Sequence, residues 1–378
     1  MPKASLYIHI PFCASFCSYC DFFSVTGFND EYIDLFLNAL ISDIKKQIEY
    51  FNIDDIPTAY IGGGTPSVLG KKAEALFNAL KKMPSFNPLE FTIEANPESA
   101  DEKFLNICRE GGVNRLSLGV QTFYEKSRAA VNRIGDAGLL EKKLKLASGF
   151  FPEMLSVDLI TGLPYQNEKI IADDIKRVTA FNPVHVSLYS LTVEKGTELY
   201  NCRKNINLLP DEEKKDNLWL EARDFLEDKG FKQYEVSSFA KEGRECLHNI
   251  RYWYMEGWLG AGPGASGTII NEETGRAKRY TYADDIDSYI KEPQIHKAIC
   301  DELDKDDFIK ESLLMGFRYK NGPDKKLFKK RFSCDIEECI PQTLLRWKDK
   351  DKMLFLNSFL TDAFLEMEKI KNQSELSS

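Results

Sequence analysis

Several features that would assign a function class are missing from this sequence of 378 residues. No run approaches the roughly 18 uninterrupted apolar residues of a membrane-spanning helix, and the apolar start LYIHIPF is too short and too early for a signal peptide. Basic residues are not in excess: 50 Lys and Arg stand against 59 Asp and Glu, and the net charge of -9 disfavours broad attraction to nucleic acid or to an anionic membrane. We therefore expect a cytoplasmic protein without a nucleic-acid partner or a membrane span, which still permits peripheral contact with membrane proteins.

A disulfide framework is also absent, because the nine cysteines are an odd number and most of them are isolated. Isolated cysteines usually pack as small hydrophobic residues, so we expect this role for Cys108, Cys202, Cys246, Cys300, Cys334 and Cys339. The other three, Cys13, Cys17 and Cys20, fall within the eight residues CASFCSYC. Thiols this closely spaced usually indicate metal binding or redox chemistry.

The first half of the chain alternates short β-type runs with helical patterns. The β-type runs are LYIHI, TAYIGGG, EFTIEANP, NRLSLGVQT, MLSVDLITGLP and VHVSLYSLT. Six such units predict a parallel sheet with crossover helices, and the predominantly apolar runs indicate strands covered on both faces. An open doubly wound sheet and a partial or full β/α barrel both fit this pattern.

Polar residues cluster directly after nearly every predicted strand. The cysteine cluster follows the first run, Gly62 to Thr65 follow the second, and Glu94 with Asn96, Gln121 and Asp158 lie at the ends of later ones. In a barrel these positions meet around one mouth, whereas an open sheet would focus them at one crevice. We therefore predict an α/β fold with a partial (β/α)6 barrel.

The spacing C-x3-C-x2-C suits an iron–sulfur cluster. It lacks the distant second pair of ligands that a zinc finger or ribbon needs. A 4Fe-4S cube held by three thiolates leaves one iron open to a substrate or cofactor. A structural zinc or a chance cluster of thiols is the alternative.

The stretch YIHIPFCASFCSYCDFF resembles the start of radical S-adenosylmethionine (SAM) proteins, in particular the oxygen-independent coproporphyrinogen III oxidase-like group with its haem-chaperone branch. The resemblance continues in order through YIGGGTPS, TIEANPES, GVNRLSLGVQTF, SVDLITGLPYQ, VSLYSLTVEKGTEL and YEVSSFAKEGRECLHNIRYW. It implies a 4Fe-4S cluster on Cys13, Cys17 and Cys20, with the amino and carboxylate groups of SAM on the open iron.

The same resemblance implies a set of SAM-binding residues. Tyr7 and Tyr19 could shield the site or simply pack the core, and the glycine run could be an ordinary strand-to-helix turn. Glu94 is a carboxylate in an apolar run, so a buried structural ion pair is its other interpretation. The positions implied to contact SAM are Tyr7, Tyr19, Gly63, Gly64, Thr65, Glu94, Gln121, Arg133 and Asp158.

Two short stretches bear on the branch of this group. Coproporphyrinogen dehydrogenases typically carry a fourth cysteine two residues after the third, where this chain has Phe22. The pattern HNIRYW, which starts at His248, resembles a mark of the haem-chaperone branch and implies His248 as a haem ligand. The expected function is therefore haem delivery to a recipient protein, with a reductant such as flavodoxin or ferredoxin. Oxidation of coproporphyrinogen III is the alternative, so enzymatic activity stays open.

The pattern predicts three parts of the chain. Residues 1–205 form the barrel core, 206–285 an extension that completes the barrel and carries HNIRYW, and 286–378 a small, mainly helical C-terminal domain.

Overall fold

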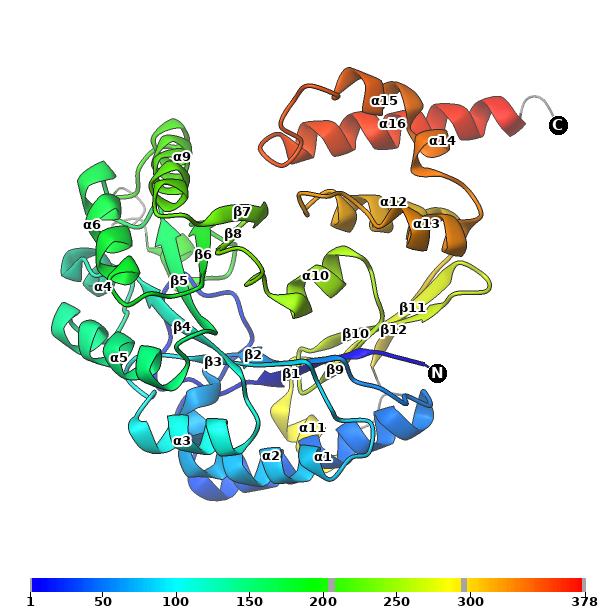
Figure 1. Cartoon of the computed structure of the whole chain (residues 1–378). Coiled ribbons are helices and arrows are strands. Elements are labelled where there is room, and N and C mark those ends of the chain that lie inside the picture. The colour runs from blue at the N-terminus through cyan, green and yellow to red at the C-terminus, as the bar shows by residue number, and fades with distance from the viewer. Residues whose placement is uncertain (1, 203–207, 294–297, 376–378) are drawn as a thin grey trace.

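The computed structural model describes residues 2–202, 208–293 and 298–375. Its centre is a curved sheet in which six strands run parallel in sequence order (Figure 1). Each strand pairs in parallel with the next one along the chain. The strands are β1 (Ser5–Ile10), β2 (Thr58–Gly63), β3 (Glu90–Ala95), β4 (Arg115–Gln121), β5 (Leu155–Thr161) and β6 (His185–Ser190).

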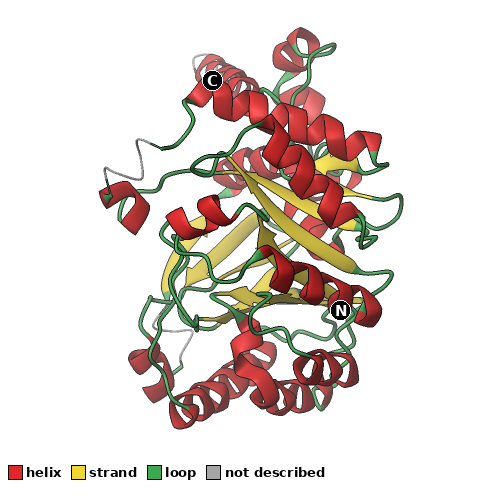
Figure 2. Ribbon diagram, turned by 90° about the vertical axis from the view of Figure 1, so that its left-hand side faces the viewer, coloured by secondary structure: helices red, strands yellow, loops and turns green. Residues whose placement is uncertain are grey.

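Helices cover the convex face of this sheet, as Figure 2 shows with the helices in red outside the yellow strands. Their starts are set locally: the Asn29 side chain accepts a hydrogen bond from the Tyr32 amide at 2.8 Å, and so caps the first helix. The helices up to the last parallel strand are α1 (Asp30–Tyr50), α2 (Ala73–Lys81), α3 (Glu102–Glu110), α4 (Glu125–Ala130), α5 (Ala137–Phe150) and α6 (Glu168–Thr179), with the 3₁₀ helix η1 (Pro66–Lys72) before α2.

The two faces of the sheet differ in chemistry. On β3, Phe91 and Ile93 point into the apolar core beneath the helices, while Glu90 and Glu94 alternate with them and point to the concave side. Both faces are buried, as the apolar runs predicted. The concave face nevertheless carries polar side chains, because a partial barrel fills its interior partly with hydrogen-bonded groups.

Further strands extend the sheet at both edges. One edge gains β9 (Trp258–Ala261), parallel to β1, and the other gains β8 (Ser238–Ala240), antiparallel to β6. The described residues form twelve strands in the order β12-β11-β10-β9-β1-β2-β3-β4-β5-β6-β8-β7. The other elements between β6 and residue 293 are α7 (Glu198–Asn201), α9 (Glu212–Asp228), β7 (Lys232–Glu235), α10 (Leu247–Trp253), β10 (Ser266–Asn271), β11 (Arg276–Thr281) and α11 (Ile286–Lys291). The prediction of a partial (β/α)6 barrel is confirmed.

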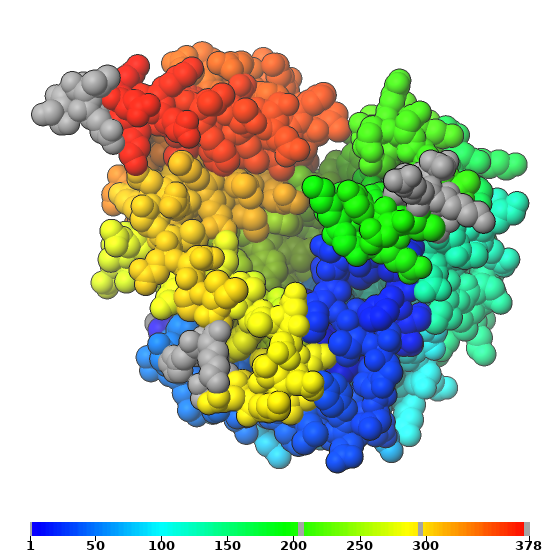
Figure 3. Space-filling model, turned by 180° about the vertical axis from the view of Figure 1, so that it is seen from behind, coloured from blue at the N-terminus to red at the C-terminus, as the bar shows by residue number. Residues whose placement is uncertain are grey.

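The last part of the chain is mainly helical (Figure 1). Its apolar side chains share one buried cluster with Met255, Trp258 and Ala277 of the preceding segment. Seen from behind, the orange and red residues of this part form a lobe above the yellow residues (Figure 3). The segment begins with a strand, because β12 (Ile299–Leu303) pairs with β11 at the sheet edge. The helices are α12 (Lys305–Gly316), α13 (Lys325–Phe332), α14 (Ile336–Cys339), α15 (Pro341–Arg346) and α16 (Leu356–Glu375).

The domain bounds at residues 205 and 285 stay a prediction, and the structure adds that the helical lobe starts at α12. The expected packing role holds for Cys108 and Cys246, which are buried, but is wrong for Cys300, which is exposed on the edge strand. Among the described residues, no helix is both long and apolar enough to cross a bilayer.

Candidate functional site

A cavity of about 300 Å³ lies at the carboxyl ends of the parallel strands. Parallel strands bring the residues that follow them to the same edge of a sheet, which is where barrel proteins build their sites. Most of the residues predicted from the sequence line this one cavity. They are Cys13, Cys17, Tyr19, Cys20, Gly63, Gly64, Thr65, Glu94, Gln121, Arg133 and Asp158.

The three cysteines lie in the loop that leaves β1. Backbone hydrogen bonds fix the start of this loop, because the Cys13 amide donates to the Val25 carbonyl at 2.9 Å. The Cys13 sulfur lies 3.4 Å from the Thr65 hydroxyl, and Arg133 Nη1 donates to the Cys17 sulfur at 3.4 Å. The loop therefore presents its thiols to the cavity, and the segments that follow β2 and α4 contact it there.

The protonation and the spacing of the thiols bear on what they could hold. Burial raises the pKa of Cys13 and of Cys20, so both are neutral thiols until a metal displaces the proton. In the part of the chain that the structure describes, no three His, Cys, Asp or Glu side chains are arranged to hold a single metal ion. A cube does not need such convergence, because each thiolate binds a different iron.

The glycine run after β2 lets the backbone pass close to this loop. Gly63 has φ +110°, and a Cβ there would lie 2.8 Å from the His9 ring. A Cβ at Gly64 would lie 2.8 Å from the Phe12 carbonyl oxygen and 3.0 Å from the Cys13 sulfur. Side chains at these positions would push the cysteine loop away from the turn, so the glycines have a steric role here.

Polar atoms without a protein partner line the cavity wall. Gln121 has φ +69° at a register shift where β4 meets β5, which turns its side chain toward the cavity. The buried atoms Gln121 Oε1, Arg133 Nε and Glu98 Oε2 have no hydrogen-bond partner in the structure. Buried polar atoms are almost always paired, so this wall suits a ligand that carries both donors and acceptors.

Some residues of the wall are missing from the set of sites predicted from the sequence. Asn96 accepts a hydrogen bond from Arg133 Nη2 at 2.7 Å and donates to the Thr65 hydroxyl at 2.9 Å, so it joins two predicted residues. Glu98 and Tyr189 also line the cavity. The sequence places Asn96 among the polar residues after the third predicted strand but gives it no role, and the signal that could have found Glu98 is its position in the same segment, EANPE.

Two buried carboxyl groups form the inner wall. Burial and the nearby Asp158 raise the pKa of Glu94 to about 7, although bonds from the Tyr60 hydroxyl and the Gly63 amide oppose the shift. Burial raises the pKa of Asp158 to about 6, against hydrogen bonds from Ser187 and Ser117. Both groups therefore change protonation close to neutral pH, and they can donate or accept a hydrogen bond from a ligand.

Tyr7 lies away from this cavity. Its hydroxyl is 3.2 Å from His9 Nδ1, and its ring stacks near that of Tyr60, with centroids 6.3 Å apart. His9 Nε2 in turn lies 2.9 Å from the Phe23 carbonyl oxygen, just after the cysteine loop. Tyr7 is thus placed to support the loop and the interior layer of the barrel, and contact with SAM stays a prediction.

His248 lies at the opposite end of the strands, on α10, which fills the concave side of the sheet (Figure 1). The residue is 1% exposed, and its Nδ1 lies 2.9 Å from the Thr58 hydroxyl at the start of β2. Burial and the nearby Arg251 lower its pKa to about 3, so the imidazole is neutral. Ligation of haem by His248 stays a prediction, and it requires α10 to leave this position.

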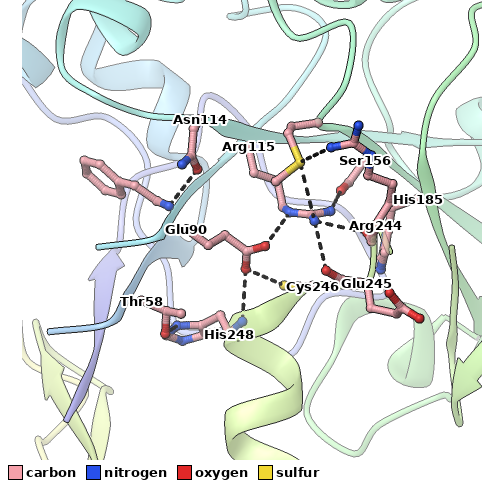
Figure 4. A network of polar contacts seen from close by, with 12 residues as sticks. Thr58, Glu90, Asn114, Arg115, Ser156, His185, Arg244, Glu245, Cys246 and His248 are labelled. Atoms are coloured by element: carbon pink, nitrogen blue, oxygen red, sulfur yellow. Dashed lines mark hydrogen bonds and ion pairs between the residues drawn. The ribbon is translucent and has the colours of Figure 1, made fainter. Parts of the chain in front are cut away.

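A polar network holds α10 to the amino ends of the strands (Figure 4). Glu90 accepts from Arg115 Nε at 2.9 Å, from the His248 amide at 3.0 Å and from the Cys246 thiol at 3.3 Å. Arg115 Nη2 also donates to the carbonyl oxygens of Arg244 and Glu245. The two charges are therefore paired and hydrogen-bonded where they are buried, and they tie the start of α10 to β3 and β4.

The rim of the cavity is apolar and open to solvent. Phe22, the residue in place of a fourth cysteine, is 70% exposed and lines the cavity with Phe16, Ile134 and Tyr189. These side chains come from the cysteine loop, from the segment after α4 and from the end of β6. An apolar ligand or partner surface could approach the site here.

Known proteins are similar to this chain in sequence and in fold. The Radical SAM superfamily model matches residues 7–178. The chain is 35% identical to the heme chaperone HemW of Lactococcus lactis, over 88% of this chain and 86% of that protein, and 35% identical to the HemW of Bacillus subtilis, over 90% of each. The structure of the coproporphyrinogen III oxidase HemN from Escherichia coli shares the fold with a TM-score of 0.80, at 22% identity, over 96% of this chain and 90% of that one. The chain therefore belongs to the radical SAM superfamily, in the HemN-like group and its HemW branch.

Proposed function

We propose that this protein is a haem chaperone that carries a 4Fe-4S cluster and SAM in the cavity at the carboxyl ends of the strands. The observation that carries the proposal is the convergence of the three cysteines with unpartnered polar atoms around one cavity. Proteins 35% identical along most of this chain are named heme chaperones. The function we propose is delivery of haem to recipient proteins in the cytoplasm.

Cys13, Cys17 and Cys20 would hold three irons of the cluster. When bound, the cluster and SAM would supply one-electron radical chemistry. The chain contributes the surroundings: the backbone of Gly63 and Gly64 allows close approach, and Gln121, Arg133 and Glu94 offer hydrogen-bonding groups to SAM. An electron has to come from a reductant such as flavodoxin or ferredoxin.

Oxidation of coproporphyrinogen III is the second candidate function. The fold shared with the HemN structure favours it. Phe22 stands where the dehydrogenases typically carry a further cysteine, and this replacement favours the chaperone. The apolar rim around Phe22 is compatible with a tetrapyrrole in either case.

A paired assay on one preparation tests the proposal. The protein is reconstituted anaerobically with iron and sulfide, and then titrated with haem and, separately, incubated with coproporphyrinogen III, SAM and dithionite. We expect stable haem binding, seen as a shifted Soret band, and no protoporphyrinogen. Turnover of coproporphyrinogen would support the second function. A protein that neither binds haem nor converts coproporphyrinogen would contradict both functions.

The haem ligand needs a separate test, because His248 is buried in this structure. H248A should weaken haem binding if this imidazole is the ligand. H185Q is the matched control, since His185 is an equally buried imidazole at the same end of the strands. Unchanged haem affinity in H248A would place the ligand elsewhere.

A further inference from the structure

The helix α10 and the cavity are separated by one aromatic side chain, that of Tyr60. The His248 ring packs against the Tyr60 ring with centroids 5.2 Å apart and an interplanar angle of 34°. On its other side His248 meets Tyr252 edge to face, at 4.8 Å. His248 also contacts Thr58, two residues before Tyr60 on β2. The position of α10 therefore constrains the Tyr60 ring.

The far end of Tyr60 reaches the wall of the cavity. Its hydroxyl donates to Glu94 Oε1 at 2.7 Å, and Glu94 lines the cavity. Gly62 leaves room for this bond, because a Cβ there would lie 3.0 Å from the Tyr60 ring and 3.1 Å from the Glu94 carboxyl group. One side chain thus touches α10 with its ring and the cavity carboxylate with its hydroxyl.

We propose that Tyr60 is a positioning residue that couples the placement of α10 to the orientation and charge of Glu94. The inference deepens the proposed function, because it rests on Glu94 facing SAM. It gives HNIRYW a role in the protein without haem. Movement of α10 would then change the SAM site by way of Tyr60 and Glu94.

The charge of Glu94 reports this coupling. The groups that face it are the Tyr60 hydroxyl and the Gly63 amide from β2, Asp158 from β5, and the phenols of Tyr7 from β1 and Tyr189 from β6. The Tyr60 hydrogen bond stabilises the carboxylate and so lowers its pKa. Loss of that bond should raise the pH at which Glu94 ionises.

The experiment measures this ionisation in the protein without cluster or SAM. Infrared difference spectra against E94Q isolate the carboxyl band of Glu94 during a pH titration. We expect a wild-type midpoint near pH 7 and a midpoint about one pH unit higher in Y60F. H248A should shift the midpoint in the same direction by a smaller amount, since the ring loses its support. In the Y60F/H248A double variant the second change should add nothing.

Y252F is the matched control, because it removes a phenol from the same aromatic cluster and should leave the midpoint unchanged. An unchanged ionisation midpoint of Glu94 in Y60F would overturn the proposal. So would a shift of the midpoint by H248A that is equally large in the wild-type and the Y60F background. SAM binding is measured separately by calorimetry on the reconstituted protein. A wild-type protein that binds no SAM would refute the proposed function, while the carboxyl titration would still decide the coupling.

Discussion

The two ends of the six parallel strands differ in whether their buried polar groups are paired. At the amino end, Glu90 and Arg115 are 1% and 2% exposed at their side chains, and they pair with each other and with the start of α10. At the carboxyl end, polar atoms of Gln121, Arg133 and Glu98 are buried without a partner around a cavity. The amino end also has unpartnered atoms, among them His185 Nδ1, His248 Nε2 and Trp253 Nε1. These atoms carry no charge, because burial keeps the two imidazoles neutral and an indole is always neutral.

The comparison separates a structural role from a binding role with one criterion. Paired buried charges contribute to a defined arrangement of the chain, and breaking one pair leaves a costly unpaired charge. Unpaired buried polar atoms beside a cavity cost stability unless a ligand satisfies them. The amino end thus fixes α10, and the carboxyl end is built for a ligand.

The largest effect is expected from the cysteine loop. C13A, C17A and C20A should each abolish the cluster, measured as bound iron and sulfide after anaerobic reconstitution, because the loop would keep only two of its thiolates. The control is C202A, which changes a cysteine outside the loop and should retain the full iron content. A single loop variant with wild-type iron content would break the assignment.

At the amino end, E90Q should destabilise the fold by about 3–5 kcal/mol, because it leaves the buried Arg115 charge without its partner. The measurement is the free energy of unfolding in urea. E337Q removes an exposed ion pair, that of Lys325 and Glu337, and should cost about 1 kcal/mol or less. Equal losses in the two variants would show that the Glu90 network does not hold the structure.

The pH dependence of the free energy of unfolding should report the ionisation of Glu94 at the carboxyl end. The pKa of Glu94 is about 7 against an ordinary value of 4.5, so the folded protein binds more protons than the unfolded chain between these values. The free energy of unfolding should therefore fall as pH rises through this window, by roughly 3 kcal/mol from this group. E94Q should remove this contribution, whereas E102Q, at the exposed start of α3, should keep it. A wild-type curve that rises across the window after subtraction of the E94Q curve would contradict the prediction.

The smallest effect is expected at the strained backbone of Gln121. A residue other than glycine at φ +69° stores strain, so Q121G should stabilise the protein by about 0.5–1 kcal/mol. Q121A keeps the strain and also lacks the amide. Both variants should bind SAM more weakly, and only Q121G should gain in thermal unfolding. A loss of stability in Q121G would show that the amide itself stabilises the protein without ligand.

The sequence alone predicted the cavity well, since its residues follow strands in the order of the chain. The carboxyl ends of adjacent parallel strands must meet, and each of Cys13, Gly64 and Glu94 stands shortly after a strand or near its end. Asp158 lies in the middle of β5 and reaches the cavity from there. The role of Asn96 was harder to predict, because an asparagine after a strand is also common in turns. Only its bonds to Arg133 and Thr65 distinguish it.

The amino-acid sequence by itself determined the parallel strands, the cysteine loop and the edge of the sheet where they meet, because alternation and spacing are local properties. Only the tertiary structure decided that His248 lies at the other edge, bound to Glu90 across 158 positions of the chain. The path of α10 depends on pairing between a buried charge and its distant partners. Such a contact leaves no periodic trace in either segment.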